Sequence, residues 1–282
     1  MIALPPPRVS GLGVRASCSP RIRDAARRKR MKSHQKALLT DEIAFRAAVA
    51  AEATGSFTPS ASSNTLKKDL VWYYKNRLIG SAPGRKIVAR LQKASKGRCA
   101  YCHIATATTL DHSFPKASFP TLAVEPLNLV PSCRDCNMGR GEGQGKLSIS
   151  PYYDHWLEGF DWLRASIPDL LHPEDLEFKP ERGRMSDSQW DLLTAFMRAV
   201  DLSGRYAELA LDEFLTLVRE LQNSGQADDM PTVKAVLRER HVARVQALGV
   251  NRWQSAAFEA WLNAADSIDW ITICGAAGKY EA

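Results

Sequence analysis

The 282-residue sequence has no run of about 18 uncharged apolar residues, so we expect no membrane-spanning helix. Its first 20 residues lack the charged start and the long apolar stretch of a secretory signal, and no internal repeat is evident. With 45% hydrophobic and 24% charged residues, it also lacks the composition of a disordered or collagen-like chain. The sequence therefore indicates a globular protein, long enough for one large domain or two smaller ones.

Acidic residues are scarce at the front of the chain. Residues 1–98 contain 21 lysines and arginines but only 5 aspartates and glutamates. Residues 99–150 contain four of each kind, whereas residues 151–282 contain 13 basic and 22 acidic residues. This asymmetry predicts an anionic partner for the front of the chain, and nucleic acid is the first candidate.

The first 36 residues are expected to form a disordered basic arm. Residues 21–36 alone contain eight lysines and arginines and one aspartate. Such a segment either binds an anion or is simply solvated, and Met31 is an alternative translation start.

Residues 37–98 are expected to be helical and basic, with a linker at residues 55–64. In the last predicted helix, residues 85–95, the apolar side chains fall on one face. The opposite face presents basic residues that are candidates for DNA contacts, namely Arg85, Lys86 and Arg90.

Two further regions follow the central module. Residues 151–185 are interpreted as an aromatic-rich connector packed on that module, and residues 186–282 as an α-helical domain. The sequence from Ser186 to Gln189 is typical of a capping box that begins the first helix of this domain. Asn251 is expected to cap its fourth helix.

The cysteines are informative by their spacing. Cys99 and Cys102 form one C-x-x-C pair, and Cys133 and Cys136 form a second pair about 30 residues later. Each such turn directs two sulfurs toward one tetrahedral ion, so we expect a structural zinc site rather than a redox pair or chance spacing. Because zinc thiolates persist under reducing conditions, the expected compartment is the cytoplasm.

Between the cysteine pairs and directly after them lies a pattern suited to phosphodiester hydrolysis. Asp111 and His112 end a β-prone stretch, and Asn137 directly follows the last cysteine, near the start of an expected helix. Two strands and a helix clipped by zinc would bring these side chains together. Carboxylate and amide oxygens suit a hard divalent cation such as Mg²⁺ or Mn²⁺, and a histidine can accept the proton of an attacking water.

The motifs C-x-x-C, DH-x-x-PK and NLVP-x-C-x-x-CN resemble those of the HNH, or ββα-metal, endonucleases. The resemblance covers about 50 residues, and it is closest to the four-cysteine McrA-like branch and to the HNH nucleases of Septu-type anti-phage systems. It implies His112 as general base and Asn128 as the residue that fixes the loop behind it. It also implies Asp111 and Asn137 as catalytic-metal ligands and the four paired cysteines as zinc ligands.

Two basic residues near these motifs are candidates for phosphate contacts. Lys116 ends the DH-x-x-PK motif, where it either contacts phosphate or is simply solvated. Arg140 stands where members of the family usually carry a lysine, and an arginine can bind a phosphate through two parallel hydrogen bonds. The glycine-rich residues 139–145 predict that the preceding helix is short.

The sequence as a whole predicts an α+β protein, in which a small zinc-clipped ββα-metal nuclease module at residues 99–150 is flanked by mainly α-helical regions. The expected function is metal-dependent cleavage of double-stranded DNA, in anti-phage defence. The alternative is a zinc module that binds nucleic acid or protein without cutting. The acidic C-terminal region is a candidate docking platform for a defence partner such as an ATPase.

Overall fold

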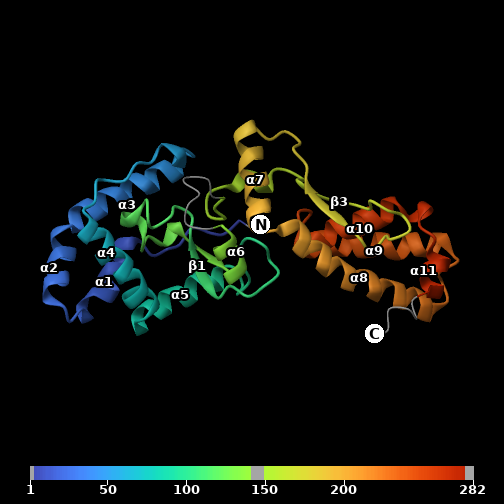
Figure 1. Ribbon diagram of the computed structural model, residues 1–282, viewed down its shortest axis with the longest axis horizontal. Coiled ribbons are helices and arrows are strands. Elements are labelled where there is room, and N and C mark those ends of the chain that lie inside the picture. The colour runs from blue at the N-terminus through green and yellow to red at the C-terminus, as the bar shows by residue number, and fades with distance from the viewer. Residues whose placement is uncertain (1–2, 141–148, 277–282) are drawn as a thin grey trace. The chain divides into compact units, whose positions relative to one another are not determined.

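The computed structural model describes residues 3–140 and 149–276 (Figure 1). By its internal contacts the chain divides into two units, Met1–Glu158 and Gly159–Ala282. Within the described residues, each unit combines helices with one two-stranded antiparallel sheet, which confirms the expected α+β class. None of the described helices combines the length and the hydrophobicity that crossing a bilayer requires.

The first unit begins with a series of helices. Serine or aspartate side chains begin four of them, where each accepts a hydrogen bond from a backbone amide of the first turn. A π-helical turn, Tyr74–Ile79, extends the fourth helix toward the fifth. The helices are α1 (Gly11–Cys18), α2 (Ala25–Ser33), α3 (Gln35–Ala50), α4 (Asn64–Tyr73) and α5 (Ala82–Ala94).

The structure corrects the expectation of a disordered arm at residues 1–36. Helices α1 and α2 lie in this segment, and its apolar side chains are buried in the same core as Leu70 and Leu110. The basic residues of α2 remain compatible with this packing because Arg27 and Arg30 pair with the carboxylate of Asp69 on α4. The buried apolar residues of the segment include Val14, Cys18, Ile22 and Met31.

The central hairpin and its helix follow these five helices. Strands β1 (Thr109–His112) and β2 (Leu129–Ser132) pair antiparallel, and α6 (Arg134–Gly139) starts directly after β2. Figure 1 shows this ββα segment, in green, beside the blue and teal helices of its own unit. Helix α6 has six residues and ends at the first glycine of the glycine-rich stretch, as expected, and the later glycines lie outside the described residues.

The second unit is a hairpin packed on helices. Strand β3 (Leu163–Ser166) pairs antiparallel with β4 (Glu177–Pro180), and β3 packs against α10. The predicted capping box is confirmed, because the side chains of Ser186 and Gln189 make both of its hydrogen bonds at the start of α7. The helices are α7 (Asp187–Ala199), α8 (Leu202–Ser224), α9 (Met230–Leu248), α10 (Trp253–Asn263) and α11 (Trp270–Ala276).

The connector expected at residues 151–185 is not one element. Its first eight residues belong to the first unit, where the hydroxyl of Tyr152 donates to the carbonyl of Leu129. The remainder belongs to the second unit, where the indole of Trp261 donates to the carbonyl of Pro173.

Asn251 also differs from its predicted role as a helix cap. Its side-chain oxygen accepts hydrogen bonds from the backbone amides of Trp162 and Leu163, at 2.8 and 3.2 Å. The residue before α10 is Arg252, which makes no side-chain capping bond. The side chain that the local sequence predicts as a cap of α10 therefore binds the backbone amides at the start of β3 instead.

Candidate metal centre and active site

The four paired cysteines form one buried cluster. Their sulfur atoms all lie within 4.8 Å of one another, and the sulfurs of Cys102 and Cys133 are 3.9 Å apart. A tetrahedral zinc–thiolate site with bonds of about 2.3 Å requires sulfur–sulfur distances of about 3.8 Å. The donor set and spacing therefore fit a structural zinc ion.

Backbone hydrogen bonds attach the first cysteine turn to the hairpin. The amide of Ala100 donates to the carbonyl of Pro131 in β2, at 2.9 Å, and the amide of Cys99 donates to the carbonyl of Ala105. The second pair is held by α6, because the sulfur of Cys133 caps this helix and accepts from the amide of Cys136. The cysteine cluster thus connects β2 with α6, and β1 is held to both through its pairing with β2.

A cavity of about 350 Å³ brings together three of the residues singled out by the sequence, Asp111, His112 and Asn137. Asp111 and His112 come from adjacent positions of β1, and Asn137 comes from the second turn of α6. The other lining residues are Tyr74, Leu110, Pro115, Lys116 and Met138.

His112 is largely buried, and its ring is held by two neighbours. The Nε2 atom lies 3.0 Å from the carbonyl oxygen of Ala123, and the ring of Tyr74 meets it edge-on with centroids 4.6 Å apart. Because a carbonyl can only accept, this contact favours the tautomer with its proton on Nε2, in which Nδ1 is the basic nitrogen. Burial raises the pKa of Tyr74 to about 12, so its phenol stays neutral beside the imidazole.

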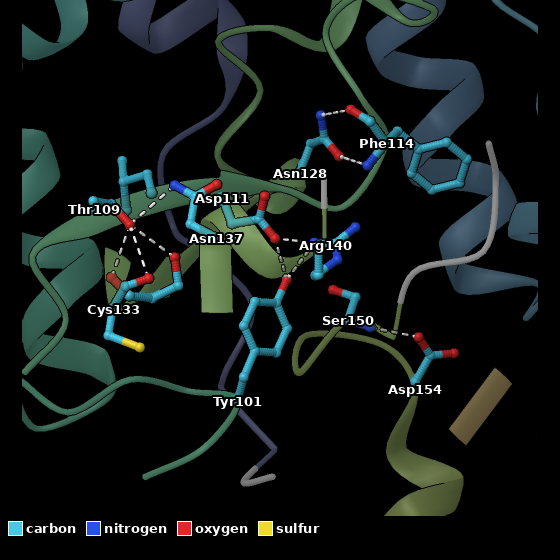
Figure 2. Close-up of polar contacts among 12 residues, drawn as sticks. Tyr101, Thr109, Asp111, Phe114, Asn128, Cys133, Asn137, Arg140, Ser150 and Asp154 are labelled. Carbon is cyan, nitrogen blue, oxygen red and sulfur yellow. Dashed lines mark hydrogen bonds and ion pairs between the residues drawn. The ribbon is translucent and has the colours of Figure 1, made fainter. Parts of the chain in front are cut away.

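Asn128 is fully buried behind the loop that positions His112. Its side-chain oxygen accepts from the amide of Phe114 at 2.6 Å, and its side-chain nitrogen donates to the carbonyls of Phe114 and Leu122. Figure 2 shows the paired contacts with Phe114. Since Leu122 directly precedes Ala123, the same amide fixes the segment whose carbonyl meets the imidazole.

Asp111 and Asn137 are the oxygen donors of the cavity. The Asn137 side-chain nitrogen donates to the hydroxyl of Thr109 at 3.0 Å, so the side-chain oxygen is the atom of this amide that could hold a metal. Oδ2 of Asp111 accepts from the hydroxyl of Tyr101 at 2.9 Å and pairs with the guanidinium of Arg140 (Figure 2). A carboxylate and an amide carbonyl on one open cavity are a donor set that fits a hard divalent cation.

The basic residues expected to contact phosphate fall into two groups. Arg85, Lys86 and Arg90 are exposed on α5, and Lys116 is partly exposed at the cavity. Arg140 differs from expectation, because it is only 9% exposed and its charge is paired with Asp111 instead of facing solvent. A buried carboxylate is costly without a compensating charge, which explains where the guanidinium lies.

Sequence reasoning missed three residues that shape this site, Tyr74, Tyr101 and Thr109. Tyr101 lies inside the first C-x-x-C pair, so the sequence predicted that it lies near the cysteine cluster, but not that it contacts Asp111. Burial raises the pKa of Tyr101, so its hydroxyl keeps the proton that it donates. Tyr74 lies 38 positions before His112 in the chain, yet both residues line the same cavity. No local sequence pattern predicts that they lie close together.

Comparison with known proteins gives partial similarities. No family model and no solved structure matches the chain. Over 98 residues it is 37% identical to protein ea31 of Escherichia phage lambda, which covers 32% of this chain and 33% of that protein. Over 104 residues it is 29% identical to the Septu protein PtuB of Bacillus thuringiensis, which covers 31% of this chain and 40% of that protein. The chain thus matches less than half the length of either relative.

Proposed function

We propose that this chain is a metal-dependent HNH endonuclease that hydrolyses phosphodiester bonds of double-stranded DNA in anti-phage defence. The observation that carries the proposal is the cavity on which an oriented histidine, a carboxylate and a side-chain amide meet. The neighbouring four-cysteine cluster supports it, since it fits the zinc site of the family that the motifs resemble. Residues 99–150 form the proposed nuclease module.

In the proposed mechanism His112 acts as general base. Its Nδ1 accepts a proton from the attacking water, while the Ala123 carbonyl holds the opposite ring nitrogen and so stabilises the imidazolium that forms. Asn128 donates to the carbonyl of the preceding residue, Leu122, and so holds the segment that carries the Ala123 carbonyl. A Mg²⁺ or Mn²⁺ ion, held by Asp111 and Asn137, would stabilise the charge that develops on the phosphate and on the departing oxygen.

The proposed DNA-binding surface combines the exposed basic side chains of α5 with Lys116 at the cavity. Phosphate contacts of this kind position a duplex but carry no base information, so we propose that they set affinity and not sequence preference. Arg140 is not part of this surface, since its guanidinium pairs with Asp111.

A role in defence is supported by the similarity to the Septu protein PtuB, and a cytoplasmic location by the need of a zinc–thiolate site for reducing conditions. A partner such as an ATPase is proposed for the second unit, whose residues 159–282 contain 20 acidic and 13 basic residues. The similarity to a phage protein makes a role in a mobile element the competing setting. A plaque assay in cells that carry the gene with its neighbours distinguishes the two settings.

The test of catalysis is plasmid nicking and linearisation by the purified full chain, with Mg²⁺ or Mn²⁺ and with EDTA. We expect His112→Ala to slow cleavage by about 100-fold or more, with zinc content and DNA binding nearly unchanged, because a general base acts in the transition state. His155→Ala is the matched control, since His155 is exposed in the same unit and does not line the cavity. Cleavage by His112→Ala at the wild-type rate would favour the non-catalytic zinc module instead.

A further inference from the structure

Tyr101 lies between two zinc-binding cysteines and is fully buried. The turn that carries it is fixed twice, by the sulfur cluster and by the hydrogen bond from the amide of Ala100 to the carbonyl of Pro131. The backbone from which its ring projects is therefore held by contacts that none of the cavity-lining residues makes.

The hydroxyl of Tyr101 reaches out of the zinc turn to the cavity carboxylate. It donates to Oδ2 of Asp111 at 2.9 Å, and it accepts from the guanidinium of Arg140 at 2.9 Å. Figure 2 shows the phenol, the guanidinium and the carboxylate oxygen converging. Both neighbours of the hydroxyl are themselves buried, so this small network is closed on the side away from the cavity.

Fixing one carboxylate oxygen determines the direction of the other. The terminal torsion of an aspartate is broad and roughly two-fold, so Asp111 would sample a wide range of orientations without a partner. With Oδ2 held by the phenol and the guanidinium, Oδ1 becomes the oxygen available to the cavity that Asp111 lines. Hydrogen bonds of this kind to a ligating carboxylate tune metal affinity.

We infer that Tyr101 is a positioning residue, which orients Asp111 for the divalent cation and so makes that site depend on the geometry of the zinc turn. The inference rests on the proposed function, because it assigns Asp111 as a ligand. The alternative is a purely structural role. In that case the hydrogen bonds of the buried hydroxyl stabilise the fold but do not affect metal binding by Asp111.

The test compares Tyr101→Phe with Tyr152→Phe in the full, zinc-loaded chain. Both substitutions remove one buried hydroxyl from the first unit, but that of Tyr152 donates to the backbone carbonyl of Leu129 and does not touch Asp111. The readouts are the dissociation constant of Mn²⁺, measured without DNA by electron paramagnetic resonance, and the zinc content per chain. We expect Tyr101→Phe to weaken Mn²⁺ binding by about 10- to 100-fold with unchanged zinc, and Tyr152→Phe to leave Mn²⁺ binding unchanged.

Four results would overturn the inference. Mn²⁺ affinity of Tyr101→Phe within about twofold of wild type would show that the phenol does not position the ligand. Loss of zinc from Tyr101→Phe, or equal weakening by Tyr152→Phe, would show that the hydroxyl acts on the fold in general. A wild-type chain that binds no Mn²⁺ would overturn both this inference and the proposed function, whereas the other results leave the proposed function standing.

Discussion

The backbone amide of Gly11 donates a 2.9 Å hydrogen bond to Oε2 of Glu125, 114 positions later in the chain. The neighbouring amide of Leu12 donates to the carboxylate of Glu42 at 2.8 Å. The first amides of α1, which have no acceptor within the helix, thus donate to two carboxylates. This is expected, because the N-terminus of a helix carries a partial positive charge. Glu125 immediately precedes the 3₁₀ turn Pro126–Asn128, so the N-terminal helix is docked on the segment that carries Asn128.

Gly11→Ala should destabilise the first unit. A Cβ at this position would lie 2.9 Å from Oε2 of Glu42 and 3.0 Å from Oε2 of Glu125, which would push both carboxylates from their amide partners. We expect a loss of about 1–3 kcal/mol in the free energy of unfolding, measured with denaturant. Gly55→Ala is the control, since no atom lies within 4 Å of its added Cβ. Equal stability of Gly11→Ala and wild type would contradict this docking.

Removal of zinc should unfold the proposed nuclease module, because the four sulfurs connect the turn that precedes β1 to α6. We expect elemental analysis to find one zinc per chain and Cys99→Ser to lose it. Cys274→Ser should keep the metal, because that cysteine lies in the second unit. A purified chain without zinc and with its hairpin intact would refute the assignment.

Neutralising the basic face of α5 should weaken DNA binding. The triple variant Arg85→Gln, Lys86→Gln, Arg90→Gln removes three exposed charges and leaves the buried face of the helix intact. We expect the slope of log affinity against log salt to become less steep by about 0.9 for each phosphate that the variant no longer neutralises. Fluorescence anisotropy with labelled duplexes of several sequences measures affinity and its sequence dependence.

The control for this variant removes three exposed charges from the second unit. It carries glutamine at Lys179, Arg184 and Arg238. If both triple variants weaken binding equally, the effect is one of net charge and α5 is not the contact surface.

Asp69→Asn should weaken the attachment of α2 to α4. It should also make the free energy of unfolding less dependent on pH in the acid range. The hydrogen bond from Arg30, followed by that from Arg27, lowers the pKa of Asp69. A carboxyl whose pKa is lower in the folded than in the unfolded state stabilises the fold above its unfolded pKa of about 3.9, and this is lost as pH falls through the folded value. At pH 7 we expect the variant to be less stable by about 1–3 kcal/mol, since charged hydrogen bonds are broken.

Denaturant melts from pH 7 downward measure this effect. The wild-type chain and the variant should converge in stability below the folded pKa of Asp69. Asp161→Asn, at an exposed site of the second unit, should follow the wild-type profile throughout. Parallel profiles for Asp69→Asn and wild type would mean that the pairing with α2 contributes nothing.

The parts of the site that the sequence predicted are those that local spacing determines. Two C-x-x-C turns imply one ion wherever the intervening chain runs, and the strand pairing of β1 with β2, which leads directly into α6, lies between the two turns. Adjacent Asp111 and His112 at the end of β1, and Asn137 after the last cysteine, then have little freedom to lie elsewhere. Glycine at position 139 likewise marks the end of α6.

The parts that the sequence did not predict depend on contacts between distant segments. The disordered arm was predicted from the many basic residues at positions 21–36. That prediction did not consider the apolar side chains around them, which are buried in a core supplied by α4 and the hairpin. An asparagine before a helix usually caps it, but the side-chain oxygen of Asn251 instead accepts from the amides of Trp162 and Leu163, where β3 begins. For Arg140, the sequence predicted a positive charge near the site. It did not predict that this charge would form an ion pair with the buried carboxylate of Asp111.

The division of the chain into two units has an optical consequence. Five of the seven tryptophans follow Gly159, and Trp162, Trp261 and Trp270 are fully buried there, whereas five of the seven tyrosines precede it. Tryptophan emission should therefore report mainly on the second unit, and the near-ultraviolet tyrosine signal mainly on the first unit, which contains the four-cysteine cluster. Chelation of zinc should change the tyrosine signal while most of the tryptophan emission persists, so one sample in one cuvette can follow the two units separately.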